Sequence, residues 1–341
     1  MTRLLHPSGT PSGIEEAAKI LREGGTVAFP TETVYGLGAN ALDPVAAAKI
    51  FAAKGRPSWD PLIVHVGDRA MLDRVAVVTA RAERLIEAFW PGPLTLLLER
   101  TEAVPDAVTA GRPLVGVRMP SHPLALALIR AAGVPIAAPS ANRFGHTSPT
   151  TAEHVLEDLD GRIDAVLDGG PTTVGVESTV LDPGRQEEPM LIYRPGAVTP
   201  EMIEAVAGAA RIYRPVTMPE KAPAGPPSGM PSPGVGIRHY APRARLILVD
   251  GAAELRAREE ELLRGGEKVG VMLPQGWTAA ESAEVYRWGE WEDRQALAQR
   301  LFAGLRDLDA RGVTAILCPL PEARGLGLAI RDRLEKAARS E

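Results

Sequence analysis

Two positive charges flank a glycine in the sequence Lys54-Gly55-Arg56-Pro57. Gly55 and Pro57 would end a helix at this point and hold Arg56 in extended backbone. Two cations fixed in this way suit a triphosphate, because an arginine grips phosphate oxygens with two parallel hydrogen bonds. The alternative interpretation is that both cations only stabilise the carboxyl end of a helix.

Two further polar residues interrupt apolar runs. His65 alternates with apolar residues in the run 61–66, and Arg118 interrupts the run 114–119. A buried guanidinium needs an anionic partner, which is either a bound carboxylate or phosphate or an Asp or Glu of the fold. A lone histidine in a strand is more often structural than functional. Both residues are therefore candidates for ligand binding, with a structural role as the alternative.

The other candidates stand where strands are expected to begin or end. They are residues 30–38, Ser140 with Asn142, Ser148, residues 177–179 and Arg194. Hydroxyl, amide and guanidinium groups at such ends form pockets that recognise polar ligand atoms. Each motif is weak alone, and it is their joint order along the chain that indicates one site.

Apolar periodicity predicts the elements that must position these residues. Strands are expected at 26–29, 62–66, 94–98, 114–119, 134–138, 165–167, 179–181 and 191–194. Helices are expected after the capping box of Ser12 and Glu15 and at 43–54, 80–89, 124–132, 152–159 and 200–207. This alternation predicts an α/β domain with mixed strand directions.

A second, smaller unit follows. Strands at 246–249, 269–273 and 315–318 alternate with helices at 252–264, 294–309 and 326–338. The pattern predicts a three-layer α/β domain. Prolines concentrate between Arg214 and Arg243 and would interrupt helix and strand alike. We therefore expect domains at 1–213 and 245–341, joined by a semi-rigid linker at 214–244.

Composition limits the function classes. The 341 residues, 45% of them hydrophobic, are enough for two folded units, and a net charge of -5 leaves no extended basic field for nucleic acid. The single cysteine, Cys318, excludes a disulfide framework and a zinc site of paired thiolates. Residues 1–13 lack the apolar core of a signal peptide and no run is long enough to span a membrane, so we expect a cytoplasmic protein.

Residues 36–41 satisfy a loose dinucleotide-binding pattern, with glycines at 36 and 38. A true fingerprint opens a helix directly after its strand, whereas here the next helix is expected only at Asp43. We interpret these glycines as allowing a tight loop. A standard phosphate-loop sequence is also missing, so any ATP must bind without one.

Taken together, the motifs resemble the threonylcarbamoyl-AMP synthase family, with its YrdC-like catalytic domain, in the long form that has an extra C-terminal domain. The resemblance rests on Pro30-Thr31-Glu32-Thr33-x-Tyr35-Gly36-Leu37, Lys54-x-Arg56, Ser140-x-Asn142, Glu177-Ser178-Thr179-Val180, Arg194-Pro195-Gly196, Ser232-Pro233-Gly234 and His239-Tyr240-Ala241-Pro242. It implies a twisted, open α/β domain with a positively charged concave cavity. It also implies a Rossmann-like C-terminal domain and a linker that covers the cavity.

The resemblance implies an enzyme, L-threonylcarbamoyladenylate synthase, which is a nucleotidyltransferase. Such an enzyme forms threonylcarbamoyl-AMP and pyrophosphate from L-threonine, bicarbonate and ATP, for the threonylcarbamoyladenosine modification of tRNA. It implies Mg²⁺ bound with ATP, no cofactor held by the protein, and a downstream tRNA threonylcarbamoyl transferase that receives the product. Metal ligands on the chain itself are not predicted.

The resemblance also implies contacts for individual residues. ATP would meet Lys54, Arg56, Asp60, Ser140, Asn142, Ser148, Arg194 and Tyr240, and threonine would meet Thr33, His65, Arg118 and Ser178. Lys54 and Arg56 are the expected catalytic cations, and Arg118 serves either threonine or the nucleotide. Asp60 stands where the family commonly has Asn, and its carboxylate would repel phosphates unless Mg²⁺ or Lys54 intervenes.

Two other functions are compatible with a domain of this kind. One is an RNA-binding module without catalysis, which the net charge disfavours, although a weak local RNA contact stays open. The other is carbamoyl transfer for metallocentre maturation, because a similar domain occurs in larger proteins of that class. The zinc-binding cysteine pairs that accompany the domain there are missing here.

Overall fold

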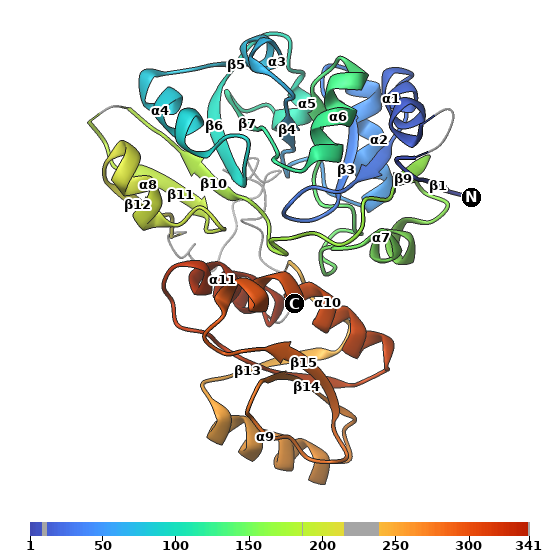
Figure 1. The fold of residues 1–341 in the computed structure, drawn as a ribbon, viewed down its shortest axis with the longest axis vertical. Coiled ribbons are helices and arrows are strands. Elements are labelled where there is room, and N and C mark those ends of the chain that lie inside the picture. The colour runs from blue at the N-terminus through green and yellow to red at the C-terminus, as the bar shows by residue number, and fades with distance from the viewer. Residues whose placement is uncertain (9–11, 186, 215–238, 340–341) are drawn as a thin grey trace, which may run out of the picture.

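The structure is a computed structural model that describes residues 1–8, 12–185, 187–214 and 239–339. Two sheets organise these residues into an N-terminal and a C-terminal domain, stacked one below the other in Figure 1. The predicted linker, 214–244, is described only at 214 and at 239–244, so most of it, with the motif Ser232-Pro233-Gly234, lies outside the described residues.

The N-terminal domain is built on one mixed sheet. Its strand order, within the described residues, is β1-β9-β2-β3-β8-β4-β7-β6-β10-β11-β12, with β5 beside β6. The strands are β1 (Arg3–Leu5), β2 (Val27–Phe29), β3 (Gly36–Asn40), β4 (Ile63–His65), β5 (Ala76–Val77), β6 (Leu94–Arg100), β7 (Leu114–Arg118), β8 (Ile136–Ala137), β9 (Ala165–Leu167), β10 (Thr179–Asp182), β11 (Met190–Arg194) and β12 (Ala210–Ile212). The helices are α1 (Gly13–Arg22), α2 (Pro44–Lys54), α3 (Arg69–Val75), α4 (Ala80–Phe89), α5 (Asp106–Thr109), α6 (Pro123–Ala132), α7 (Ala152–Leu159) and α8 (Pro200–Ala207).

The C-terminal domain has three layers, as predicted. Its parallel sheet runs β13-β16-β14-β15. The strands are β13 (Arg245–Val249), β14 (Val269–Pro274), β15 (Glu284–Gly289) and β16 (Ala315–Pro319), and the helices are α9 (Ala252–Arg264), α10 (Arg294–Ala310) and α11 (Leu326–Ala337). Helix α9 covers the far face of this sheet, while α10 and α11 lie between the sheet and the N-terminal domain (Figure 1).

Local signals place the helix that precedes the two cations. The Asp43 side chain accepts a hydrogen bond from the backbone N–H of Val45, and Pro44 begins α2. The helix ends at Gly55, whose φ of 62° lies in the left-handed region. These features fix where Lys54 and Arg56 leave the helix, and they confirm the predicted boundaries.

The short elements β1, α3, β5, α5 and β12 were not predicted, and two further segments differ from expectation. Residues 36–40 form strand β3 rather than a tight loop, because Gly38 lets the strand approach Phe29 and Ile136; a Cβ atom there would come within 2.8 Å of both side chains. Strand β15 was not predicted, since its charged and polar residues obscure the apolar signal and it pairs with β14 alone. Neither difference changes the fold class.

The two domains share packing at their contact. Val34 and Val176 of the N-terminal domain are buried in the same hydrophobic cluster as Phe302 and Leu301 of α10. A Cβ added at Gly175 would lie 2.3 Å from the Cα of Gln299, so the loop before Val176 lies directly against α10. The C-terminal domain therefore supports the loops at 30–35 and 172–178.

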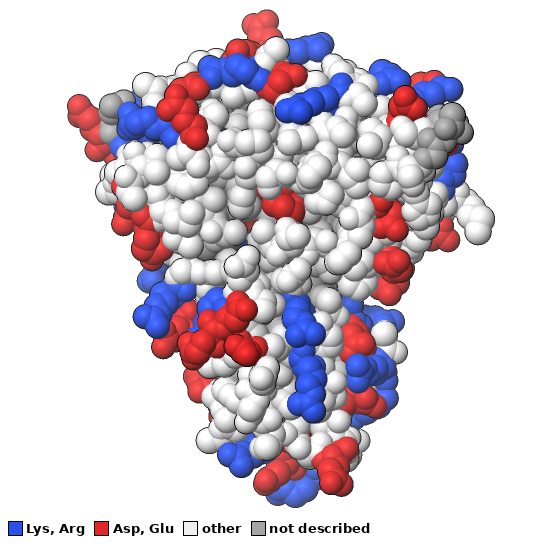
Figure 2. All heavy atoms as spheres, in the orientation of Figure 1, with Lys and Arg blue, Asp and Glu red and all other residues white. Residues whose placement is uncertain are grey.

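Charge on the visible face is mixed. Figure 2 shows lysine, arginine and acidic side chains interspersed over the C-terminal domain and along the upper rim, with few charges in between. None of the described helices is both long and apolar enough to cross a membrane.

Candidate functional site

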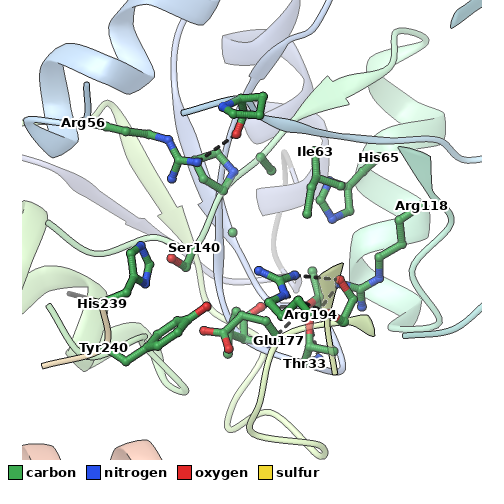
Figure 3. Close-up of a pocket in the computed structure, with 17 residues that line it drawn as sticks. Thr33, Arg56, Ile63, His65, Arg118, Ser140, Glu177, Arg194, His239 and Tyr240 are labelled. Atoms are coloured by element: carbon green, nitrogen blue, oxygen red, sulfur yellow. Dashed lines mark hydrogen bonds between the residues drawn. The ribbon is translucent and has the colours of Figure 1, made fainter. Parts of the chain in front are cut away.

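Strand pairing brings the predicted residues of distant motifs to one pocket (Figure 3). Strand β4 pairs in parallel with β7, and its register places His65 opposite Arg118. Strand β10 pairs with β11, which places the end of β11 at Arg194 beside the start of β10. A bridge between Gly36 and Ser140 adds the loop that follows β8.

One end of the pocket is a buried arginine held by an acid behind it. Arg118 Nη2 lies 2.6 Å from the Glu32 carboxylate, and both side chains are nearly fully buried. Although burial opposes ionisation, the adjacent Arg118 lowers the pKa of Glu32 below its ordinary value. Arg118 Nη1 also donates a hydrogen bond of 2.9 Å to Thr33 Oγ1. Arg118 therefore has an acidic partner in the fold, Glu32, and also lines the pocket. Its structural role and its role as a ligand contact are compatible.

His65 lies beside this arginine as a neutral side chain. Burial, reinforced by the charge of Arg118, lowers the pKa of His65 to about 3. Its ring meets the edge of Phe29 at 6.2 Å between centroids, and its buried Nδ1 has no hydrogen-bond partner. A neutral imidazole with a free nitrogen at the pocket can donate to or accept from a polar ligand.

The second cation of the pocket is Arg56. Its Nε donates to the carbonyl of Asp60 at 3.1 Å, and its Nη2 donates to that of Pro61 at 2.8 Å. Nη2 also lies 3.0 Å from Asp60 Oδ2. Burial raises the pKa of Asp60, while Arg56 and Lys54 act in the opposite direction. Asp60 thus supports Arg56 and does not itself line the pocket.

Lys54 lies beneath the loop that carries Ser140. Its Nζ donates to the carbonyl oxygens of Ser140 and Asn142 at 2.6 and 2.5 Å. Burial, together with the charge of Arg56, holds the pKa of Lys54 well below its ordinary value. Lys54 therefore fixes the loop, and it does not line the pocket in this arrangement.

The third cation is Arg194, which lies between Glu177 and Arg118 in Figure 3. Its Nε and Nη2 donate to the carbonyl and the Oγ of Ser178 at 3.0 and 3.1 Å. Ser178 Oγ also hydrogen-bonds Thr95 Oγ1 at 2.8 Å. Next to them, Ser148 Oγ donates to Glu177 Oε1 at 2.5 Å. Glu177 is the one carboxylate among the described residues that line the pocket.

The described end of the linker, 239–244, closes another side of the pocket. Tyr240 enters from the side away from His65 and Arg118, with its hydroxyl toward the pocket (Figure 3). Its ring stacks on Phe302 of α10 at 5.7 Å, and burial raises the pKa of Tyr240 to about 12. His239 packs against Phe144 at 5.7 Å, and burial together with Arg56 and Lys54 holds its pKa well below the ordinary value.

Most of the predicted site residues meet in this pocket. Those that line it are Thr33, Arg56, His65, Arg118, Ser140, Ser178, Arg194 and Tyr240. Those that support it from behind are Lys54, Asp60, Asn142 and Ser148. Glu177 and His239 also line it, although neither was among the predicted contacts. Both residues could have been predicted from the sequence, since each lies inside a motif on which the resemblance rests.

Two family models match the chain and together cover most of it. The model described as "Telomere recombination" matches residues 19–196, and the model described as "Threonylcarbamoyl-AMP synthase, C-terminal domain" matches residues 198–339. Both halves of the two-domain architecture therefore have counterparts in known families.

Individual proteins agree with these models. The threonylcarbamoyl-AMP synthase of Pyrococcus abyssi (strain GE5 / Orsay) is 46% identical over 331 residues, which cover 95% of this chain and 94% of the relative. That of Bacillus subtilis (strain 168) is 46% identical over 329 residues, covering 95% and 92%. The crystal structure of P. abyssi Sua5 complexed with L-threonine is 42% identical, has a TM-score of 0.88, and covers 99% of this chain and 97% of its own.

The matching models span both domains, and the similarity to these relatives runs over nearly the whole of each chain. The likeness includes the two-domain fold as well as the sequence. The chain therefore belongs to the threonylcarbamoyl-AMP synthase family.

Proposed function

We propose that this protein joins L-threonine, bicarbonate and ATP into threonylcarbamoyl-AMP and pyrophosphate, and so acts as a nucleotidyltransferase. The observation that carries the proposal is one pocket lined by three arginines, Arg56, Arg118 and Arg194, together with the hydroxyl side chains of Thr33 and Ser178. Separate cations in one buried site suit an amino-acid carboxylate and a polyphosphate held side by side.

The first half of the reaction needs threonine held by its polar groups. Thr33, His65, Arg118 and Ser178 are the proposed contacts. Arg118 binds the threonine carboxylate, since its guanidinium faces the pocket while Glu32 neutralises it from behind. The neutral His65 adds a hydrogen bond without a second charge. The threonine amino nitrogen then attacks the carbon of bicarbonate, and loss of water leaves a carbamate.

The second half is transfer of the AMP group. A carbamate oxygen attacks the α-phosphorus of ATP, the bond to the β-phosphate oxygen breaks, and pyrophosphate leaves. Arg56 and Arg194 contact the phosphates, and Lys54 and Asn142 hold the Ser140 loop that faces them. Tyr240 adds a contact to the nucleotide, while Asp60 and Ser148, which were predicted as further ATP contacts, act by holding Arg56 and Glu177. No protein nucleophile takes part, so rate acceleration comes from positioning and charge neutralisation.

Mg²⁺ belongs to the proposal as the counterion of ATP. It prefers oxygen ligands and usually binds through substrate phosphates, so we assign it to the triphosphate rather than to a site on the protein. The product passes to a downstream tRNA threonylcarbamoyl transferase. The weak RNA contact also stays a prediction.

We also propose that the linker covers the pocket. The pocket, with His239 and Tyr240 in it, has a free volume of about 50 Å³, which is room for a few waters and too little for a nucleotide. Admission of ATP therefore requires these two residues to move, and their return would exclude water from the short-lived carbamate. We keep the boundaries 1–213, 214–244 and 245–341 for the catalytic domain, the cover and the C-terminal domain.

The test is product analysis with purified protein. We expect mass spectrometry to find threonylcarbamoyl-AMP, with pyrophosphate released in parallel, only when ATP, Mg²⁺, bicarbonate and L-threonine are all present. Omission of each substrate in turn is the control. Folded protein that releases no threonine-dependent pyrophosphate and forms no adduct would refute the proposal.

A further inference from the structure

A single arginine of the C-terminal domain reaches into the pocket wall. Arg333 belongs to α11, and its side chain is 0% exposed. Its Nη2 donates to the carbonyl of Glu177 at 3.2 Å, and its Nη1 donates to the carbonyl of Pro195 at 2.9 Å. These are contacts with the other domain, more than a hundred residues away in the sequence.

The two carbonyls have a particular place in the site. That of Glu177 comes directly before Ser178, and that of Pro195 comes directly after Arg194. Ser178 and Arg194 are the residues that hydrogen-bond each other and line the pocket. One guanidinium therefore clamps the start of β10 and the end of β11 at the points where both strands deliver their functional side chains.

Arg333 also neutralises the one acid of the wall. Its Nε lies 2.7 Å from Glu177 Oε2, on the side of the carboxylate away from Ser148. Burial alone would lower the pKa of Arg333, yet Tyr240, Glu177 and Asp332 raise it above the ordinary value. The guanidinium carbon also lies 5.4 Å from the centroid of the Tyr240 ring, within the range of a cation–π contact. Without this cation, Glu177 would present an unpaired negative charge to the pocket.

We propose that Arg333 is a positioning residue, through which the C-terminal domain sets the geometry of Ser178 and Arg194 and neutralises Glu177. The inference rests on the proposed function, because it takes Arg194 as an ATP contact and Ser178 as a threonine contact. It gives the C-terminal domain a part in substrate binding beyond carrying the linker.

A second interdomain arginine provides the matched control. Arg306 of α10 is also largely buried and binds Glu157 at 3.0 Å, Asp158 at 3.1 Å and the Thr147 carbonyl at 2.5 Å. None of these partners lines the pocket. Loss of either arginine removes one largely buried ion pair between the domains, Arg306–Asp158 or Arg333–Glu177, but of the two only Arg333 contacts a residue of the pocket wall.

The experiment compares Arg333→Met, Arg333→Lys and Arg306→Met in the full chain. Isothermal titration with ATP and steady-state kinetics are run well below the melting temperature of each variant. We expect Arg333→Met to weaken ATP binding and to raise the KM for ATP at least about tenfold. The KM for threonine should also rise, because Ser178 is a proposed threonine contact, but it should rise less, because Arg118 and His65 are held by β4 and β7. Arg333→Lys keeps the charge but cannot donate to both carbonyls, so its KM for ATP should lie between those of the wild type and Arg333→Met. Arg306→Met should lower the melting temperature with little change in either KM.

A double-mutant cycle with Glu177→Gln separates positioning from packing. It still serves if Arg333→Met is too unstable to assay, because Arg333→Gln, which also removes the charge, can replace it. We expect Glu177→Gln to harm ATP binding less in the Arg333 variant than in the wild type, since removing the unpaired charge relieves repulsion. Equal effects in both backgrounds, or equal rises of both KM values, would overturn the proposal. ATP binding that responds as expected in a protein making no threonylcarbamoyl-AMP would overturn the proposed reaction alone. A wild-type chain that does not bind ATP would overturn both.

Discussion

Two buried ion pairs stand in the wall of the pocket, and they are oriented in opposite ways. In the Glu32–Arg118 pair the cation lines the pocket and the acid lies behind it. In the Glu177–Arg333 pair the acid lines the pocket and the cation lies behind it. The first pair is built within one domain, whereas the second joins two domains.

The difference shows how the chain builds a two-substrate site. Arg118 and His65, at the threonine end, lie on adjacent strands of one domain whose register sets their spacing. The wall formed by Glu177, Ser178 and Arg194 depends on the neighbouring domain for both charge balance and backbone support. A change at the threonine end should therefore act locally, and a change at the domain contact should act mainly on ATP.

The largest effect should follow from breaking the self-contained pair. Arg118→Met leaves the buried Glu32 carboxylate without its partner, which costs about 3–5 kcal/mol of the free energy of unfolding. Chemical denaturation would measure this loss. Addition of Glu32→Gln to the same chain should restore part of it, and a double variant no more stable than the single would contradict the role given to Glu32.

The next effect concerns Arg56, which repeats the arrangement with the acid behind the cation. Arg56→Ala should cost about 2.7–4 kcal/mol of transition-state stabilisation, or roughly 10²–10³ in rate. Rates of threonine-dependent pyrophosphate release would measure this. A loss below tenfold would count against contact between Arg56 and phosphate.

The neutral histidine at the threonine end predicts a pH effect. With a folded pKa of about 3 against 6.5, His65 takes up a proton more readily in the unfolded chain. Its contribution to stability is therefore complete above pH 6.5 and is lost as the pH falls toward 3. From about pH 7 to 5, wild-type protein should lose about 2 kcal/mol more than His65→Gln. Thermal melts at both values test this, and equal losses would contradict it.

The smallest effect should come from the apolar part of the domain contact. Val176→Ala removes two buried carbons from the cluster shared with α10, which costs about 1.5 kcal/mol. We expect a lower melting temperature together with a modest rise in the KM for ATP and an unchanged KM for threonine. Val285→Ala, at a partly buried position within the C-terminal domain, is the control. A larger rise in the KM for threonine than in the KM for ATP would contradict the contrast between the Glu32–Arg118 pair and the domain contact.

Much of the fold could be predicted, because its signals are local. The capping box of Ser12 and Glu15, and the helix that begins at Pro44 and ends at Gly55, depend on hydrogen bonds between near neighbours. The strands that contain His65 and Arg118 show as apolar runs with one polar residue, and the strand predicted at 191–194 ends at Arg194 as expected. Strand β15 and the glycine-containing β3 could not be read in this way, since sheet neighbours rather than their own patterns define them.

The sequence by itself determined which polar residues stand at the ends of strands and helices, because capping and periodicity are properties of short segments. Only the tertiary structure decided that His65 lies opposite Arg118, that Lys54 turns to the carbonyls beneath Ser140 rather than into the pocket, and that Arg333 closes the wall from another domain. These features depend on strand register and domain packing, which arise from contacts between segments distant in the chain.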